Sequence, residues 1–152
     1  MGWSLDGFPI YGPYGYSDPK SPTSAVKRMR SGYRLRTMTR RESLPDWALG
    51  YHPNVPQQLP AGQQGPPVNE RFPLGRYVED NRFVAELGDL DQFNGRTTVT
   101  PEFPNGTYAY FVTIKEDGLP AFPYIHGLQY NGTVRTQMGP GEMVTVPAEA
   151  QD

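Results

Sequence analysis

The sequence of 152 residues contains no cysteine, which excludes disulfide bonds, thiolate metal sites and cysteine nucleophiles. It contains only two histidines, too few to hold a zinc ion by themselves. No apolar run approaches the roughly 20 residues that cross a bilayer, and no charged-then-apolar export segment opens the chain. These absences predict a soluble chain, cytoplasmic as it stands, or periplasmic or secreted if it is part of a longer protein.

Acidic residues are absent from residues 20–41, a stretch that holds eight of the 14 basic residues. From residue 70 onward, acidic residues outnumber basic ones by 12 to 6, and the net charge is −2. Arginines in the basic stretch alternate with apolar residues, as they do on a solvated strand face. This pattern favours pairing with the acidic second half over binding of phosphates, so we expect neither a nucleic-acid nor a membrane partner.

Turn-forming and aromatic residues are abundant, with 17 Gly, 17 Pro, 10 Tyr and 7 Phe. Disordered chains lack this aromatic content, and a chain of this length forms one core. The composition predicts a single domain over residues 1–152. We expect it to be mostly β, an antiparallel sandwich or partly open barrel with one or two short helices.

The strongest strand signal lies at residues 107–114, which are β-branched or aromatic and apolar on both faces, as in the middle of a sheet. Residues 52–69 are rich in proline and predict a long irregular loop suited to a lid. Further expected elements are strand–turn–strand at 2–19, a helix at 23–30 capped by Thr23 or Ser24, strands at 33–39, 76–87, 122–125 and 143–146, and a disordered tail at 147–152.

Three stretches carry the pattern of a known family: residues 2–13 (GWSLDGFPIYGP), residues 90–96 (LDQFNGR) continued by 100–111 (TPEFPNGTYAYF), and residues 122–127 (FPYIHG). In this order they resemble the YHYH-domain family. Its naming Tyr-His-Tyr-His motif falls on residues 108–111, where Ala109 and Phe111 replace both histidines. The resemblance implies a β-rich domain, often secreted, with no settled activity.

The best candidate metal site is Asp89-x-Asp91-x-x-Asn94-Gly95, with Glu102 eight residues after Asn94. Calcium needs several oxygen ligands on a tight loop, which Asp, Asn and Glu around a glycine supply. We therefore predict Ca²⁺ bound by Asp89, Asp91, Asn94 and Glu102. The alternative is that these side chains shape turns by bonding nearby backbone amides, which is the commoner arrangement.

Asp6 and His126 are the candidate proton carriers. Asp6 is followed by several tyrosines, so it could have a raised pKa and act as a base, or it could hold a turn among packed rings. His126 has a pKa suited to proton transfer, although a lone histidine is more often structural. Residues 2–6 (GWSLD) approach the nucleophile elbow, but Asp6 replaces its second glycine and the strand-to-helix context is lacking, which excludes that motif.

These features lead to the hypothesis of a metal-assisted hydrolase acting on a small ester or lactone, such as an acyl lactone. The ion would polarise a carbonyl or activate water. The catalytic residues would be Asp6, His126 and Glu102, and the substrate-binding residues would be Tyr11, Tyr14, Tyr110 and Tyr124.

Two alternatives stay open at this point. The chain could be a non-catalytic, secreted-type binding module for carbohydrate or peptide, in which exposed aromatic residues such as Trp3 and Trp47 stack on the ligand. It could also be a fragment of a larger secreted protein whose remaining part carries the chemistry. Turnover of a small-molecule substrate separates the hydrolase from the binding module.

Overall fold

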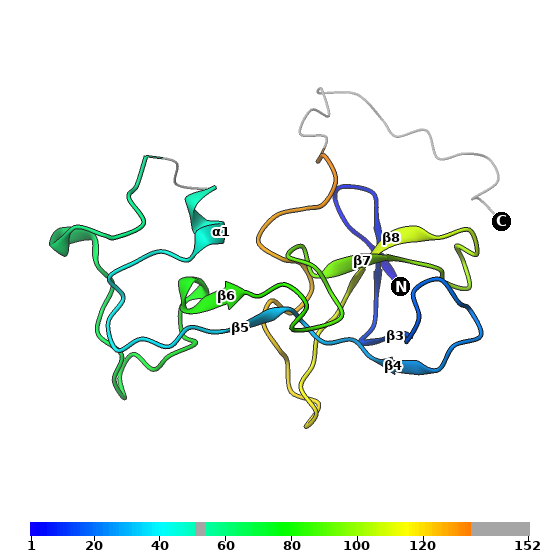
Figure 1. The fold of residues 1–152 in the computed structure, drawn as a ribbon, viewed down its shortest axis with the longest axis horizontal. Helices are drawn as coiled ribbons and strands as arrows, with labels where there is room; N and C mark the ends of the chain where they lie inside the picture. The colour runs from blue at the N-terminus through cyan, green and yellow to red at the C-terminus, as the bar shows by residue number, and fades with distance from the viewer. Residues whose placement is uncertain (51–53, 135–152) are drawn as a thin grey trace.

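The computed structural model describes residues 1–50 and 54–134. The chain forms two lobes joined at the pair β5–β6, one lobe holding most of the strands and the other holding α1 (Figure 1). The elements are β1 (Gly2–Trp3), β2 (Pro9–Tyr11), β3 (Tyr14–Tyr16), β4 (Val26–Arg28), β5 (Tyr33–Leu35), α1 (Asp46–Leu49), the 3-10 turns η1 (Ala61–Gln63) and η2 (Val78–Asp80), β6 (Asn81–Phe83), β7 (Gly95–Thr98) and β8 (Thr107–Phe111).

The lobe with most of the strands, called the strand-rich lobe below, is built on a four-stranded sheet in the order β1-β2-β8-β7. The strand expected at residues 107–114 is confirmed over residues 107–111 as β8, and it lies in the interior of this sheet. β2 runs parallel to β8, with Ile10 opposite Tyr110, whereas the other pairs in the sheet are antiparallel. The β-rich class is therefore confirmed, and the one parallel pair brings residues near position 10 beside residues near position 110.

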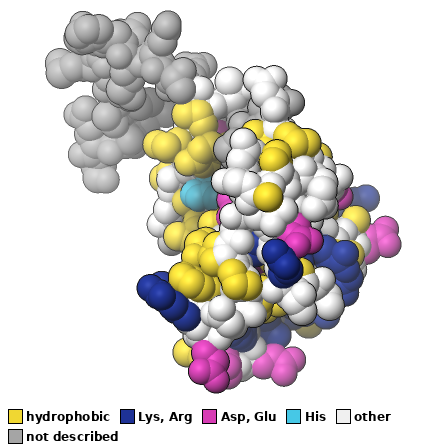
Figure 2. Space-filling view, turned by 90° about the vertical axis from the view of Figure 1, so that its left-hand side faces the viewer, with side chains coloured by type: hydrophobic (Ala, Val, Ile, Leu, Met, Phe, Trp, Pro, Cys, Tyr) yellow, Lys and Arg dark blue, Asp and Glu magenta, His cyan; other side chains and the backbone are white. Residues whose placement is uncertain are grey.

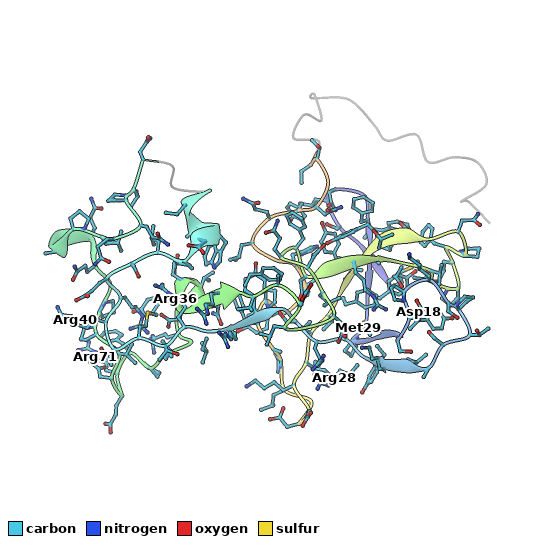
Figure 3. All side chains as sticks on the ribbon, viewed as in Figure 1. Asp18, Arg28, Met29, Arg36, Arg40 and Arg71 are labelled. Carbon is cyan, nitrogen blue, oxygen red and sulfur yellow. The ribbon has the colours of Figure 1, made fainter. Side chains whose placement is uncertain are left out.

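The core of this lobe lies on one face of β8. Ala109 and Phe111 are buried there against Met29 and Leu90, and Tyr11 packs partly on the same cluster. Figure 3 shows Met29 within the strand-rich lobe. Phe111 and Met29 also leave no room for a side chain at the adjoining strand β3, which is one reason a glycine lies in its middle.

The helix expected at residues 23–30 is absent, and this prediction is wrong. Residues Val26–Arg28 instead form β4, an antiparallel partner of β3. The Ser24 hydroxyl donates to the carbonyl oxygens of Asp18 and Ser21, so it closes a turn between the two strands rather than capping a helix. The pairing with β3 outweighed the local capping signal.

The lobe that holds α1, called the α1 lobe below, is organised by a buried ion pair. Arg41 donates from Nε and Nη2 to the two carboxylate oxygens of Asp80, at 2.7 and 2.8 Å. Arg41 also donates to the carbonyl oxygens of Pro66 and Pro73. Residues 54–69, the described part of the proline-rich loop, run beside residues 39–44 and are held there by main-chain hydrogen bonds and an isolated bridge, Ser43↔Gln58.

The remaining expected elements differ in extent. The strand expected at 33–39 is confirmed over Tyr33–Leu35, and within 76–87 only Asn81–Phe83 is a strand, preceded by η2. Residues 122–125 form turns with an isolated bridge, Tyr124↔His126, in place of a strand. The expected strand at 143–146, the tail at 147–152 and His52 lie outside the described residues. No helix in the described ranges is long and apolar enough to span a membrane.

Candidate active site

Alternation along β8 places two tyrosines on the face opposite the core. Because successive strand residues point to opposite faces, Ala109 and Phe111 enter the core while Tyr108 and Tyr110 project to the other side. Both phenol groups meet carboxylates there, and the two rings contact each other edge to face at 5.3 Å. This face of β8 is the base of the candidate site.

The first phenol–carboxylate pair joins Tyr108 to Asp91. The Tyr108 hydroxyl lies 2.9 and 3.0 Å from the two oxygens of Asp91, to which it donates. Burial raises the pKa of Tyr108, and the negative charge of Asp91 raises it further, so the phenol stays protonated. Asp91 also accepts from the main-chain amides of Phe93 and Gly95 and thereby shapes the turn before β7.

The second pair joins Tyr110 to Asp6. The Tyr110 hydroxyl donates to Asp6 Oδ2 at 2.5 Å and itself accepts from the main-chain amide of Asn131. The Gly132 amide donates to the same carboxylate oxygen at 2.9 Å. Burial by itself would raise the pKa of Asp6, but hydrogen bonding, with the nearby Ser4 hydroxyl contributing, holds it below its ordinary value. Asp6 is therefore an ionised carboxylate at neutral pH.

Next to this pair lies a serine–histidine contact. Ser4 Oγ is 3.1 Å from Nε2 of His126, and Ser4 is 7% exposed. The imidazole ring packs edge to face against Tyr110 at 4.7 Å and Tyr130 at 5.1 Å. Figure 2 shows the one described histidine reaching the surface among apolar side chains. Burial lowers the pKa of His126, with the charge of Asp6 opposing it, so the imidazole is neutral at pH 7.

Local backbone geometry brings these groups together. Ser4 and Asp6 lie in the tight turn between β1 and β2. The Ser4 amide donates to the Phe8 carbonyl and closes this turn, and Gly7 adopts the positive φ of +85° that the turn needs. His126 is fixed by its neighbour Gly127, whose amide donates to the Phe93 carbonyl. A side chain at Gly127 would clash with the backbone of Gln92, so glycine is needed for this close approach.

One oxygen of the Asp6 carboxylate is poorly satisfied. Asp6 Oδ1 is buried and no donor among the described residues meets it in good hydrogen-bond geometry, although Oδ2 accepts from Tyr110 and Gly132. An unpaired buried carboxylate oxygen is costly to leave unsatisfied. Because its pKa is lowered, Asp6 is a fixed negative charge that acts on His126, and it is not the proton carrier that the sequence led us to expect.

The structure brings together three residues that the sequence nominated separately. Asp6 and His126, expected to carry protons, both contact Tyr110, which was expected to bind substrate. Ser4, Tyr108 and Tyr130 also belong to this cluster and were not predicted. The alternation of tyrosines in residues 107–111 could have indicated Tyr108, whereas nothing in the sequence places Ser4 beside a residue 122 positions away.

The other nominated residues lie elsewhere. The Tyr11 hydroxyl donates to exposed Glu102 at 2.8 Å, and this bond lowers the pKa of Glu102. Tyr11 and Tyr14 line a small apolar pocket with Phe111. Tyr124 lies in a different groove at the junction of the lobes. No hydrogen bond within the described chain joins Glu102 to the Asp6–His126 cluster.

The four expected calcium ligands each have other partners. Asp89 forms ion pairs with Lys27 at 2.6 Å and Arg30 at 3.4 Å, which keep its pKa low against the opposing effect of burial. Asn94 donates from Nδ2 to the carbonyls of Phe111 and Ile125, and its Oδ1 is buried without a partner. No group of three or more His, Asp or Glu side chains placed to hold a metal exists within residues 1–50 and 54–134.

As they stand, these side chains do not form an oxygen cage, because both oxygens of Asp89 face cations and those of Asp91 face Tyr108 and backbone amides. Calcium binding by these residues stays a prediction.

The sheet and its phenol–carboxylate pairs define a β-rich domain built around residues 2–13 and 90–127. The chain belongs to the family described as YHYH protein, whose model matches residues 1–124. No curated protein and no solved structure matches the chain.

Proposed function

We propose that the protein is a hydrolase of small esters or lactones in which Ser4 and His126 are the reacting groups. The observation that supports this is the 3.1 Å contact between Ser4 Oγ and His126 Nε2 next to the ionised Asp6. A nucleophile within hydrogen-bonding reach of a neutral base is the arrangement that acyl transfer requires. The lowered pKa of His126 keeps that base available at neutral pH.

In the proposed reaction, His126 takes the proton of Ser4 Oγ as that oxygen bonds to the carbonyl carbon of the substrate. The ester C–O bond then breaks, and the departing alkoxide takes the proton from the imidazolium, leaving an acyl ester on Ser4. Water next loses a proton to His126, attacks the acyl carbon and releases the acid, while the proton returns to Ser4. The Asp6 charge stabilises the transient imidazolium.

Hydrolysis of a panel of p-nitrophenyl esters and short acyl lactones by the full chain tests this proposal. We expect Ser4→Ala and His126→Gln each to lower kcat/KM by about 10³-fold, because each removes a reacting group. The matched control is Ser17→Ala, since Ser17 is exposed and outside the cluster, and it should retain full activity. Absence of turnover by the unaltered protein, or full turnover by Ser4→Ala, would overturn the proposal.

The same panel tests the calcium prediction. Each protein is assayed untreated, after treatment with a chelator, and with calcium restored. Turnover that is lost on chelation and recovered with calcium would add a metal to the proposed mechanism, with Asp91→Ala as the next variant. Turnover that is unchanged by the chelator would remove the metal and leave the serine–histidine route.

The second candidate function is a binding module for carbohydrate, and one observation favours it. Trp3 is 60% exposed and Tyr124 is 52% exposed, and Tyr124 borders the groove of largest volume among those described. Trp47, by contrast, is half-buried and its indole N–H donates to the Asn81 carbonyl. Exposed aromatic rings provide flat apolar surfaces on which sugar rings stack.

A further inference from the structure

A groove of about 770 Å³ lies where the two lobes meet. Its walls come from β5, from the loop before η2 and from the hairpin that follows β8, three segments that are distant in sequence. Figure 1 shows this hairpin, in yellow, extending below β5. The volume is within the range of roughly 300–1,000 Å³ that is typical of ligand-binding sites.

The charged side chains that line this groove are all positive. Arg34, Arg76 and Lys115 border it, they are exposed, and none of them forms an ion pair within the described chain. None of its described lining residues is Asp or Glu. The basic stretch at residues 20–41 thus contributes one side of a cationic groove instead of pairing entirely with the acidic second half.

Two further arginines on the rim are held by neighbouring carboxylates. Arg28 is 3.7 Å from Glu116, whose side chain is 94% exposed, and Arg30 is paired with Asp89. Figure 3 shows Arg28 beneath the strand-rich lobe, on the side from which the hairpin extends. These pairs offset part of the charge of Arg28 and Arg30, while Arg34, Arg76 and Lys115 have no ion-pair partner among the described residues.

Aromatic rings line the same groove. Tyr33, Phe122 and Tyr124 form a row of edge-to-face contacts, with ring centroids 5.2 Å apart for the first pair and 5.8 Å for the second. Tyr124 is the outermost ring and is 52% exposed. The groove therefore combines aromatic side chains, one of them exposed, with positive charge.

We propose that this groove binds an acidic oligosaccharide whose sugar rings carry carboxylates. Sugar faces stack on exposed aromatic rings, and the guanidinium of arginine matches a carboxylate with two parallel hydrogen bonds. A chain of net charge −2 with three free cations in one groove suits a ligand of few, spaced charges better than a long phosphodiester. The proposal names the ligand class for the binding role and is independent of Ser4 and His126.

Isothermal titration of the full chain with a short oligogalacturonate tests this inference. We expect binding that weakens as salt concentration rises, and about tenfold weaker binding for each of Arg34→Gln and Arg76→Gln, since each removes a charge-assisted hydrogen bond. The matched control is Arg71→Gln, an exposed arginine of the α1 lobe that does not border the groove (Figure 3). It should bind as the unaltered protein does.

A second set of ligands makes the proposal falsifiable. Binding of a neutral oligosaccharide of equal length with the same affinity would overturn the role of charge. Tighter binding of polyglutamate or of single-stranded DNA would overturn the choice of a sugar. Ser4→Ala should retain oligogalacturonate binding, so failure of the hydrolase proposal and failure of this one are distinguishable. A further variant, Tyr124→Ala, should weaken the oligosaccharide more than it weakens polyglutamate.

Discussion

At the scale of single residues, the tyrosines of β8 act as hydrogen-bond donors that orient carboxylates. The pKa values of Tyr108 and Tyr110 are both raised, chiefly by burial, so each phenol keeps its proton and donates to an aspartate. The positions of the two replaced histidines, Ala109 and Phe111, lie on the opposite face in the apolar core. Their replacement therefore removes imidazoles from the core side of β8 and leaves the face that holds Asp6 unchanged.

A titration of His126 tests the electrostatics of the cluster. Because burial disfavours the imidazolium, His126 should titrate below the ordinary value of about 6.5. The folded state then binds fewer protons than the unfolded state between these two values, so stability should fall as the pH drops through this window. Two-dimensional NMR of the imidazole resonances, assigned with His126→Gln, measures the midpoint.

Asp6→Asn provides the control for that titration. The charge of Asp6 opposes the effect of burial on His126, so its removal should lower the His126 midpoint further. A midpoint for His126 above 6.5 in the unaltered protein, or one that rises in Asp6→Asn, would contradict the geometry of the site.

At the scale of elements, the α1 lobe depends on polar contacts more than on apolar packing. Asp80 is fully buried and accepts from Arg41 and from the amides of Gly75 and Tyr77. The guanidinium also lies 4.6 Å from the centroid of the Tyr77 ring. One ion pair therefore fastens three loop segments that have few regular elements of their own.

Removal of either partner of this pair should destabilise the protein strongly. Asp80→Asn leaves the buried Arg41 charge without its counter-ion, and we expect a loss of about 3–5 kcal/mol in the free energy of unfolding. Urea denaturation followed by circular dichroism measures it. The control is Arg40→Gln, whose pair with Glu42 is exposed on both sides and should cost less than about 1 kcal/mol. Equal costs for the two variants would contradict this interpretation.

The same ion pair predicts a loss of stability in acid. Burial would raise the pKa of Asp80, but the bonds from Arg41 and the two amides outweigh it and lower the pKa. A depressed folded-state pKa means that its stabilising contribution is present above the unfolded value of about 3.9 and is lost as the pH falls through the folded value. In Asp80→Asn this part of the acid dependence should disappear.

At the scale of the whole molecule, the two lobes are joined by aromatic packing. The Tyr33 ring contacts Phe83 of β6 at 5.5 Å and Phe122 of the strand-rich lobe at 5.2 Å. Main-chain hydrogen bonds add to this junction. The Val84 amide donates to the Gly32 carbonyl, and the Asp89 amide donates to the Arg30 carbonyl. These contacts should make the lobes unfold as one cooperative unit.

The two tryptophans report on this cooperativity separately, since Trp3 lies in β1 and Trp47 in α1. Each of the variants Trp47→Phe and Trp3→Phe keeps one tryptophan. In each variant, the urea transition followed by fluorescence should coincide with the transition followed by far-ultraviolet circular dichroism. Comparing the two signals within one variant removes any effect of the substitution itself on stability. A Trp47 transition that precedes the loss of strand signal would show that the α1 lobe unfolds independently.

Sequence patterns predicted the elements whose signals are local. The apolar run on both faces of residues 107–114 indicated an interior strand, which is observed over residues 107–111. The turn-rich residues 2–19 indicated strand–turn–strand, and the antiparallel pair β1–β2 lies within them. The capping signal at residues 23–24 misled, because pairing of Val26 with Tyr16 is a long-range contact that local propensity does not contain. For the same reason, no spacing indicated that Arg41 pairs with Asp80.

The sequence by itself determined the β-rich class, the family and the residue types available for chemistry, since composition, alternation and motif order are properties of neighbours along the chain. Only the tertiary structure decided which of these residues meet. The parallel pairing of β2 with β8 carries Ser4 and Asp6 to Tyr110 and His126, and the junction of the lobes places Arg34 and Arg76 on the same groove. Such contacts depend on chain folding over more than a hundred residues in the first case, and short-range patterns do not encode that distance.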